Sequence, residues 1–141
     1  MSTDHKAASR RVLEEGFGQG QTAVVEELVA SHWVNHFVGN PPGLPEGSEG
    51  LKQLMTLYHS AFPDLHLQID DQIGEGDQVV TRWTASGTNT GSLGPLPASG
   101  NKAVVTGMTV DRYAGGKQVE GWGIFDQLGM LAQLGFIPRP G

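Results

Sequence analysis

Residues 48–70, SEGLKQLMTLYHSAFPDLHLQID, contain the change of periodicity that decides the fold. Up to residue 62 the apolar side chains recur at helical spacing and form one stripe: Leu51, Leu54, Met55, Tyr58 and Phe62. Pro63 then ends the helix, because its ring cannot continue the helical hydrogen bonding. Beyond it, apolar residues alternate with polar ones, as in a half-buried strand: Leu65, Leu67 and Ile69. The stretch therefore predicts a helix that begins at Ser48 and a sheet that follows Pro63.

The residues before this stretch predict two more helices and a loop. Residues 5–15 carry mixed charge and predict a first helix that ends near Gly16 and Gly18. Thr22 is a candidate cap for a second helix, whose apolar residues recur at helical spacing: Val24, Val25, Leu28 and Val29. The segment 32–47, HWVNHFVGNPPGLPEG, is dense in proline and glycine and predicts a loop.

The residues that follow the stretch 48–70 predict a long antiparallel meander. Residues 77–88, 102–113 and 118–126 have the pattern of strands. The turn signals GEGD (74–77) and AGGK (114–117) and a Gly/Pro-rich excursion (91–101) separate them. Helices followed by such a meander predict an α+β fold with the helices on one face of the sheet. Glycines within the strands allow strong bending: 87, 91, 107, 121 and 123. We therefore expect a cone-shaped, curved antiparallel (mixed) sheet whose N-terminal helices enclose a pocket.

Length and composition restrict the class of protein. The 141 residues (15.0 kDa) suit one domain, 1–141. No apolar run approaches the roughly 18 residues of a membrane span, and the N-terminal residues lack the apolar stretch of a secretion signal, so we expect a cytoplasmic protein with no membrane partner. The chain has no cysteine, which excludes disulfides and thiolate chemistry. A net charge of −6 disfavours nucleic acid and favours a small, weakly charged ligand or another protein.

Several motifs together resemble one family. The order of elements and the stretches HWVNHFVGNPPG, AFPDLHL, DQVVTRWTASGTNTG, VEGW and FDQLGMLAQLG are similar to the SnoaL-like polyketide cyclases, within the superfamily that shares the nuclear transport factor two fold. The similarity covers roughly residues 8–138, and 106–135 is its most specific part. It implies the curved α+β fold and, as relatives commonly pair through the outer face of the sheet, a homodimer. That fold hosts cyclases, isomerases, dehydratases, epoxide hydrolases and non-catalytic binders, so the fold alone does not decide the activity.

Asp126 is the candidate catalytic residue, with two readings. It stands where the last strand ends and a short helix begins, and Asp is a favoured helix N-cap. The resemblance implies instead that this aspartate is the acid/base of the site. The two roles are compatible, but backbone donors would lower the pKa of the carboxyl, whereas an apolar pocket would raise it.

Without a thiol or an evident metal cluster, the chemistry open to such a carboxylate is proton transfer at an acidic carbon. A base removes a proton beside a carbonyl, hydrogen-bond donors hold the enolate oxygen, and the enolate attacks a second carbonyl of the same substrate. This intramolecular aldol reaction needs no cofactor, and positioning and general base catalysis both accelerate it.

Two histidines near the start of the loop are candidate metal ligands or substrate contacts. His32 and His36 have the spacing of zinc-protease ligands, but Trp33 stands where that motif has Glu, and Val34 and Phe37 favour an extended segment, so we predict no metal site. One of the two histidines then lies at the surface and the other packs beside the loop. The resemblance favours a different reading, in which Asn35 and His36 face the pocket as donors to a substrate oxygen.

Other candidates come from the strands. Arg82 and Trp83 are neighbours on a strand and face opposite sides of the sheet; we expect Arg82 outside and Trp83 inside, as core or as pocket wall. Glu120, Trp122, Ile124 and Asp126 share one face of a regular strand.

Trp122 could stack on a flat ligand or simply fill the core, Glu120 could line the rim or pair with a cation, and Met108 could be pocket wall or core. Asn89 replaces a histidine that we expect in many members of the family, so any proton chemistry of that histidine is missing here. Three functions remain open: a cyclase that uses Asp126, another reaction in the same pocket (isomerisation, dehydration or epoxide hydrolysis), and non-catalytic binding of a small apolar or aromatic molecule.

Overall fold

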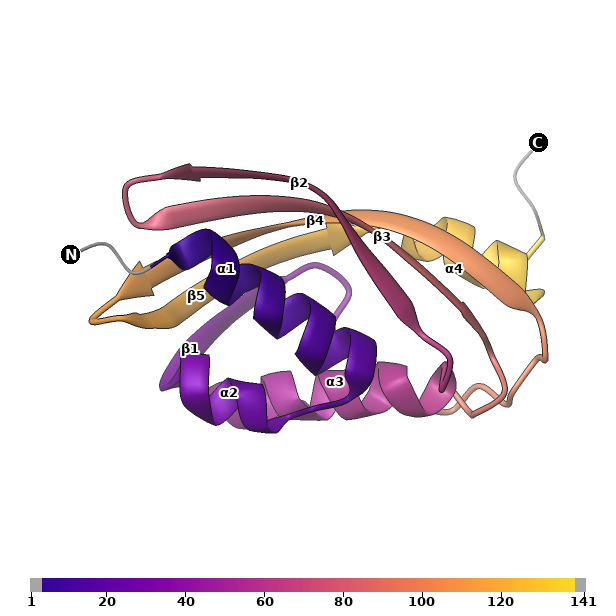
Figure 1. Ribbon diagram of the computed structural model, residues 1–141. Coiled ribbons are helices and arrows are strands. Elements are labelled where there is room, and N and C mark those ends of the chain that lie inside the picture. The colour runs from indigo at the N-terminus through magenta and orange to yellow at the C-terminus, as the bar shows by residue number, and fades with distance from the viewer. Residues whose placement is uncertain (1–3, 139–141) are drawn as a thin grey trace.

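A computed structural model describes residues 4–138, so the two ends of the predicted domain 1–141 lie outside the described residues. Its centre is a five-stranded mixed sheet in the order β1-β5-β4-β3-β2 (Figure 1). The strands span the following residues: β1 Val29–Phe37, β2 His66–Glu75, β3 Gln78–Thr88, β4 Lys102–Ala114 and β5 Lys117–Phe125. The predicted α+β class with a curved, mixed sheet is confirmed.

The strands after residue 63 form the expected meander. β2, β3, β4 and β5 pair antiparallel in chain order. The predicted turns lie between them, and Gly115 and Gly116 connect β4 to β5 with φ values of 61° and 80°. Two consecutive residues with positive φ are typical of the tight hairpin turns that match the twist of a sheet.

One prediction about the first half of the chain is wrong. Residues 32–37 were expected in a loop, but they belong to β1, which pairs in parallel with β5. The proline and glycine density that indicated a loop begins only after Phe37. The order of elements is therefore not helices first and strands afterwards, because one edge strand precedes α3.

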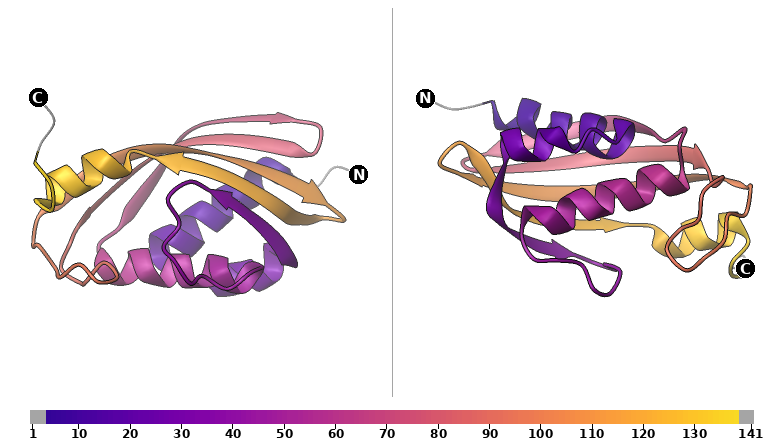
Figure 2. Two further views of the ribbon diagram at one scale, coloured as in Figure 1. Left: turned by 180° about the vertical axis from the view of Figure 1, so that it is seen from behind. Right: turned by 90° about the horizontal axis from the view of Figure 1, so that it is seen from below.

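The N-terminal helices and α3 lie on the concave face of the sheet, and α4 lies at one end of it (Figures 1 and 2). They span the following residues: α1 His5–Arg11, the π-helical segment η1 Val12–Phe17, α2 Ala23–Leu28, α3 Ser48–Ala61 and α4 Gln127–Leu134. α1 and η1 replace the predicted helix 5–15. Asp4 caps α1 by accepting a hydrogen bond from the N–H of Ala7 (3.0 Å), whereas the expected cap Thr22 makes no such side-chain bond to α2.

α3 is the helix that the sheet arches over, and its apolar stripe faces the core. Leu51, Met55 and Trp33 of β1 are fully buried in one cluster, which η1 and α2 complete. A second cluster joins the end of α3 to α4 and the far ends of β3 and β4. The two clusters leave the middle of the concave face for a cavity.

Asn89 has a structural role. Its fully buried amide donates to the carbonyl oxygens of Gly91 (2.7 Å) and Ala61 (3.3 Å), and its carbonyl oxygen accepts from the N–H of Ser99 (2.9 Å). These bonds anchor the 91–101 excursion to the end of α3, so Asn89 does not line the cavity.

Within the described part of the chain, no helix is long and apolar enough to cross a membrane.

Candidate functional site

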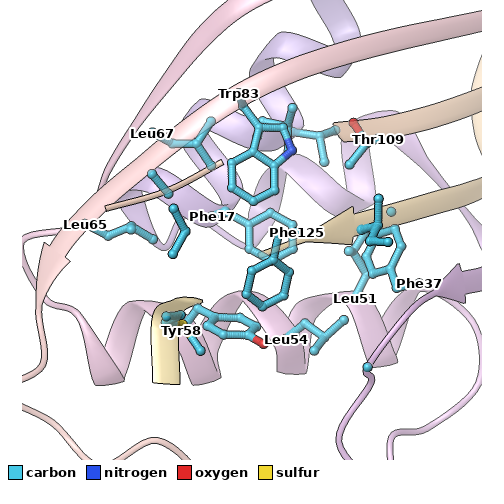
Figure 3. A pocket seen from close by; sticks show the side chains of 18 of the residues that line it. Phe17, Phe37, Leu51, Leu54, Tyr58, Leu65, Leu67, Trp83, Thr109 and Phe125 are labelled. Carbon is cyan, nitrogen blue, oxygen red and sulfur yellow. The ribbon is translucent and has the colours of Figure 1, made fainter. Parts of the chain in front are cut away.

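An apolar cavity of about 130 Å³ lies between the sheet and α3. Figure 3 shows Trp83 reaching down from β3 towards Phe17 and Phe125, above Tyr58 and Leu54 of α3. Val38 and Ile124 also line the cavity although both are exposed, so the cavity reaches the surface between the loop after β1 and the end of β5.

Three glycines on the inner face of the sheet make room for the aromatic walls. A Cβ atom on Gly121 would lie 2.8 Å from the indole of Trp33, and one on Gly123 would lie 2.9 Å from the ring of Phe37. A Cβ on Gly107 would overlap the indole of Trp83. These glycines were predicted to let the strands bend, and the structure shows that they also accommodate the rings that bound the cavity.

The cavity wall contains polar atoms without partners. Among the described residues, four buried side-chain nitrogen or oxygen atoms make no hydrogen bond, and all four belong to residues that line the cavity: Trp33 Nε1, Trp83 Nε1, Thr109 Oγ1 and Gln118 Oε1. In Figure 3 the indole nitrogen of Trp83 lies on the side of its ring that faces Thr109. Because buried polar groups are nearly always hydrogen-bonded, unpaired atoms gathered at one cavity indicate a site for a polar part of a ligand.

Asp111 is the ionisable carboxyl group of this wall. It is 4 % exposed and lies on the inner face of β4, where the residues at every second position from Ala103 to Tyr113 are buried. Burial raises the pKa of Asp111 from 3.8 to about 7, and hydrogen bonds from Ser9 and Gln118 oppose this shift by stabilising the ionised form. A carboxyl group that is half ionised near neutral pH can both accept and return a proton.

Asp111 was not among the site residues predicted from the sequence. The signal was present, because Asp111 continues the alternation of Val105, Gly107 and Thr109 on the face of β4 that turned out to be buried. The family resemblance had implied Asp126, at the end of the last strand, as the acid/base instead.

Trp83 is the predicted site residue that lines the cavity. Its neighbour Arg82 faces outwards as predicted, with its Nη1 atom 3.9 Å from Oδ2 of Asp70.

Asp126 lies outside the cavity wall. Its exposed side chain accepts a hydrogen bond from the N–H of Gly129 (2.9 Å) and so caps α4, as one of the two readings predicted. No pocket-lining atom comes from Asp126. Its role as the acid/base stays a prediction.

The readings that placed His36, Glu120, Trp122 and Met108 at the pocket are wrong, because all four lie on the outer face of the sheet; the other reading of Glu120, as the partner of a cation, is the one that the structure shows. The imidazole of His36 stacks on Trp122 with 4.8 Å between ring centroids, and its Nε2 atom lies 2.8 Å from Oε2 of Glu120. Glu120 also accepts from Arg112 (2.6 Å), and these two bonds lower its pKa. Met108 pairs with Ile124 across β4 and β5, and both side chains are exposed.

The physical reason is the register of the strands. The Cβ positions of Gly121 and Gly123 face the rings of Trp33 and Phe37 on the inner side of the sheet, so Glu120 and Trp122, which alternate with them, turn away from the cavity. His36 pairs with Trp122 and therefore follows it outwards.

Asn35 does not line the cavity either. Its side-chain oxygen accepts a hydrogen bond from the N–H of Phe37 (2.8 Å), a local bond at the end of β1. His32 and His36 lie in the extended segment that the sequence predicted, and four residues of a strand separate side chains by about 13 Å, which is too far for one metal ion.

Comparison with known proteins agrees with the fold. The chain matches the family described as SnoaL-like polyketide cyclase over residues 7–134. No curated protein matches it. Among solved structures, TsrD from Streptomyces laurentii is 26% identical with a TM-score of 0.82, and the match covers 96% of this chain and 100% of TsrD.

Two further structures are similar. IdmH from Streptomyces antibioticus, a proposed polyketide cyclase, is 32% identical with a TM-score of 0.79 over 94% of this chain and 99% of IdmH. AclR from Streptomyces galilaeus, a proposed hydroxylase, shares the fold at 22% identity, with a TM-score of 0.82 over 98% of this chain and 85% of AclR. The match to the family over residues 7–134 shows that the chain belongs to the SnoaL-like polyketide cyclase family.

Proposed function

We propose that this protein closes a ring in a small organic substrate by an intramolecular aldol-type reaction, without a cofactor, and that Asp111 is the acid/base. One observation carries the proposal: a buried carboxyl group shares an otherwise apolar cavity with four polar atoms that lack partners. The proposal keeps the reaction predicted from the sequence and moves its acid/base from Asp126 to Asp111.

The reaction balances with Asp111 alone. The Asp111 carboxylate removes a proton from a carbon beside a carbonyl group, which leaves an enolate. The enolate carbon attacks a second carbonyl of the same molecule, so one carbon–carbon bond forms and the attacked oxygen becomes an alkoxide. The protonated Asp111 then returns its proton to that oxygen. A pKa of about 7 suits both steps at neutral pH.

The unpaired atoms of the wall supply what the intermediates need. The indole N–H groups of Trp33 and Trp83 and the hydroxyl of Thr109 are donors for developing negative charge on oxygen. Oε1 of Gln118 is an acceptor for a substrate hydroxyl. Such groups are most effective in a site with apolar walls, and the walls of this cavity are mostly apolar.

The cavity volume favours a compact ligand. At about 130 Å³ it is close in size to an engineered apolar cavity of roughly 150 Å³ that holds benzene. A substrate with one ring, or a chain that folds into one ring, therefore fits inside, and a longer substrate would extend past Val38 and Ile124 to the surface.

Non-catalytic binding is the second candidate, and a specific observation favours it. Asp126, the acid/base that the family resemblance suggests, is exposed and engaged as a helix cap. If Asp111 does not ionise during turnover, the cavity is a binding site for a small apolar or aromatic molecule.

The test uses a short diketone whose two carbonyls are spaced to form a six-membered ring. In deuterium oxide, proton NMR follows the loss of the hydrogens beside the carbonyls and the appearance of the ring product. We expect the protein to accelerate both processes, and Asp111→Asn to reduce the acceleration by about two orders of magnitude. Full acceleration by Asp111→Asn would overturn the assignment of Asp111. Binding of the diketone without any exchange would favour the binder.

A further inference from the structure

A pair of buried hydroxyl groups lies behind the cavity wall. Oγ of Ser9 on α1 and the phenol oxygen of Tyr113 on β4 are 2.8 Å apart, although 104 residues separate them in the chain. Ser9 is fully buried and Tyr113 nearly so, and neither lines the cavity. The imidazole of His5 stacks on the phenol ring with 4.4 Å between centroids and closes this side of the core.

Two hydroxyl groups in one hydrogen bond leave one proton unused. Whichever oxygen accepts still carries its own hydrogen, which needs an acceptor when the group is buried. Asp111 lies two residues from Tyr113 on the same buried face of β4, and a hydrogen bond from Ser9 is one of the causes that lower the pKa of its carboxyl, so Asp111 is the acceptor for that hydrogen. The hydrogen bonds therefore run in one direction: Tyr113 donates to Ser9, and Ser9 donates to Asp111.

We propose that Ser9 and Tyr113 are positioning residues for Asp111, forming a buried hydroxyl chain that holds the carboxylate from behind while it faces the cavity. This inference rests on the proposed function, in which Asp111 is the acid/base. It gives the N-terminal helix α1 a part in the site, although α1 contributes no atom to the cavity wall.

The side chains that surround Asp111 are consistent with a hydroxyl chain that ends on its carboxylate. The side chains that act on it are Ser9 from α1, Gln118 from β5 and Tyr113 from β4, and His5 lies behind the Tyr113 ring. Burial and the negative charge of Asp111 raise the pKa of Tyr113 far above neutral, so the phenol remains a donor at every pH at which Asp111 titrates.

A purely structural pair would behave differently from a positioning pair. Removing a structural hydrogen bond changes the free energy of unfolding alone. Removing a donor to a carboxylate also makes the ionised form less favourable, so the pKa of that carboxyl rises. The titration of Asp111 is therefore the measurement that separates the two roles.

The experiment is a carbon-NMR titration of side-chain carboxyl groups in the full chain, in which Asp111→Asn identifies the Asp111 signal. We expect Ser9→Ala to raise the pKa of Asp111 by about one unit and Tyr113→Phe to raise it by less, because the phenol acts through Ser9. Ser9→Ala should fold, since alanine suits a helix and removes only one atom. Thr81→Val is the matched control: its hydroxyl is equally buried but accepts from Gln72 (3.2 Å).

An Asp111 pKa unchanged from wild type in both Ser9→Ala and Tyr113→Phe would overturn the proposal, as would an equal shift in Thr81→Val. The diketone assay provides the second measurement. In Ser9→Ala the pH at which the exchange rate rises should increase by the same amount as the pKa of Asp111. An unchanged pH profile of the rate would contradict the positioning role. If the titration shifts while Asp111→Asn keeps full activity, the hydroxyl chain stands and the proposed function fails.

Discussion

The indole of Trp33 lies over Gly121, the residue that pairs with Asp111 across β4 and β5. Nε1 of Trp33 would be 3.3 Å from a Cβ at position 121, so this unpaired donor stands next to the Asp111 backbone position. The absence of a side chain at residue 121 thus brings a donor and a carboxyl group to one end of the cavity. The predictions below follow from this arrangement of rings, glycines and polar atoms.

Gly107→Ala should destabilise the protein and alter the cavity. The added methyl group would overlap the Trp83 indole, which must move into the cavity. Overpacking of this kind costs about 1–3 kcal/mol, measurable by urea denaturation with Trp fluorescence. Gly74→Ala is the control, because the nearest atom would be 3.6 Å from its Cβ. Equal stability of the two variants would contradict the packing of Trp83 on Gly107.

Asp126→Asn should change little. Asn caps a helix nearly as well as Asp, so the free energy of unfolding should stay close to that of wild type, whereas Asp126→Ala should lose about 0.5–2 kcal/mol. The diketone exchange rate of Asp126→Asn should also be retained, since the side chain does not line the cavity. A loss of two orders of magnitude in a correctly folded Asn variant would restore Asp126 as the acid/base.

Asp111 should make the protein less stable as the pH rises from about 4 to about 7. The pKa of the Asp111 carboxyl has an ordinary value of 3.8, which applies to the unfolded chain, and is about 7 in the folded protein. Between these two values the folded state therefore binds more protons than the unfolded state. Stability then falls with increasing pH, and the effect levels off once both states are ionised. Urea midpoints of wild type minus those of Asp111→Asn should show this decline, and a difference independent of pH would refute the buried titration.

Trp83→Phe should weaken the binding of a ketone but not of a hydrocarbon. The substitution keeps an aromatic ring in the cavity and removes the unpaired N–H group. We expect a single-ring ketone to lose roughly five- to tenfold in affinity, the value of one net hydrogen bond. A single-ring hydrocarbon is the matched ligand and should bind about as before. Equal losses for both ligands in a calorimetric titration would show that Trp83 contributes shape alone.

The outer face of the sheet should join two copies of the chain. Large apolar side chains are exposed there on β1, β4 and β5: Val34, Val104, Met108 and Trp122. We propose a homodimer through this face, because a large exposed apolar patch marks an interaction site. Light scattering at micromolar concentration should report a dimer for wild type and a monomer for Met108→Asp. A wild-type monomer would contradict the proposal.

Much of the fold could be read from local patterns. The stripe from Leu51 to Phe62 and the alternation after Pro63 predicted α3 and β2 because each pattern reflects the geometry of one element. The AGGK turn and the cap at Asp126 were equally local. β1 was missed because its partner β5 lies about 90 residues further along the chain, and parallel pairing leaves no turn signal between the strands.

The site itself depended on the tertiary structure. A strand has two faces, and its sequence alone does not say which one a helix will cover. The prediction that Glu120 and Trp122 share a face was correct, yet that face is the outer one, while Asp111 and Thr109 face the cavity. A break in register after Arg112 adds Val119 to β5, so that Gln118 turns inwards although Glu120, two residues later, turns outwards. The sequence by itself determined the elements, their order along most of the chain and the family, because these follow from local periodicity and motifs. Only the packing of the sheet on α3 decided which polar side chains lost contact with water and entered the cavity.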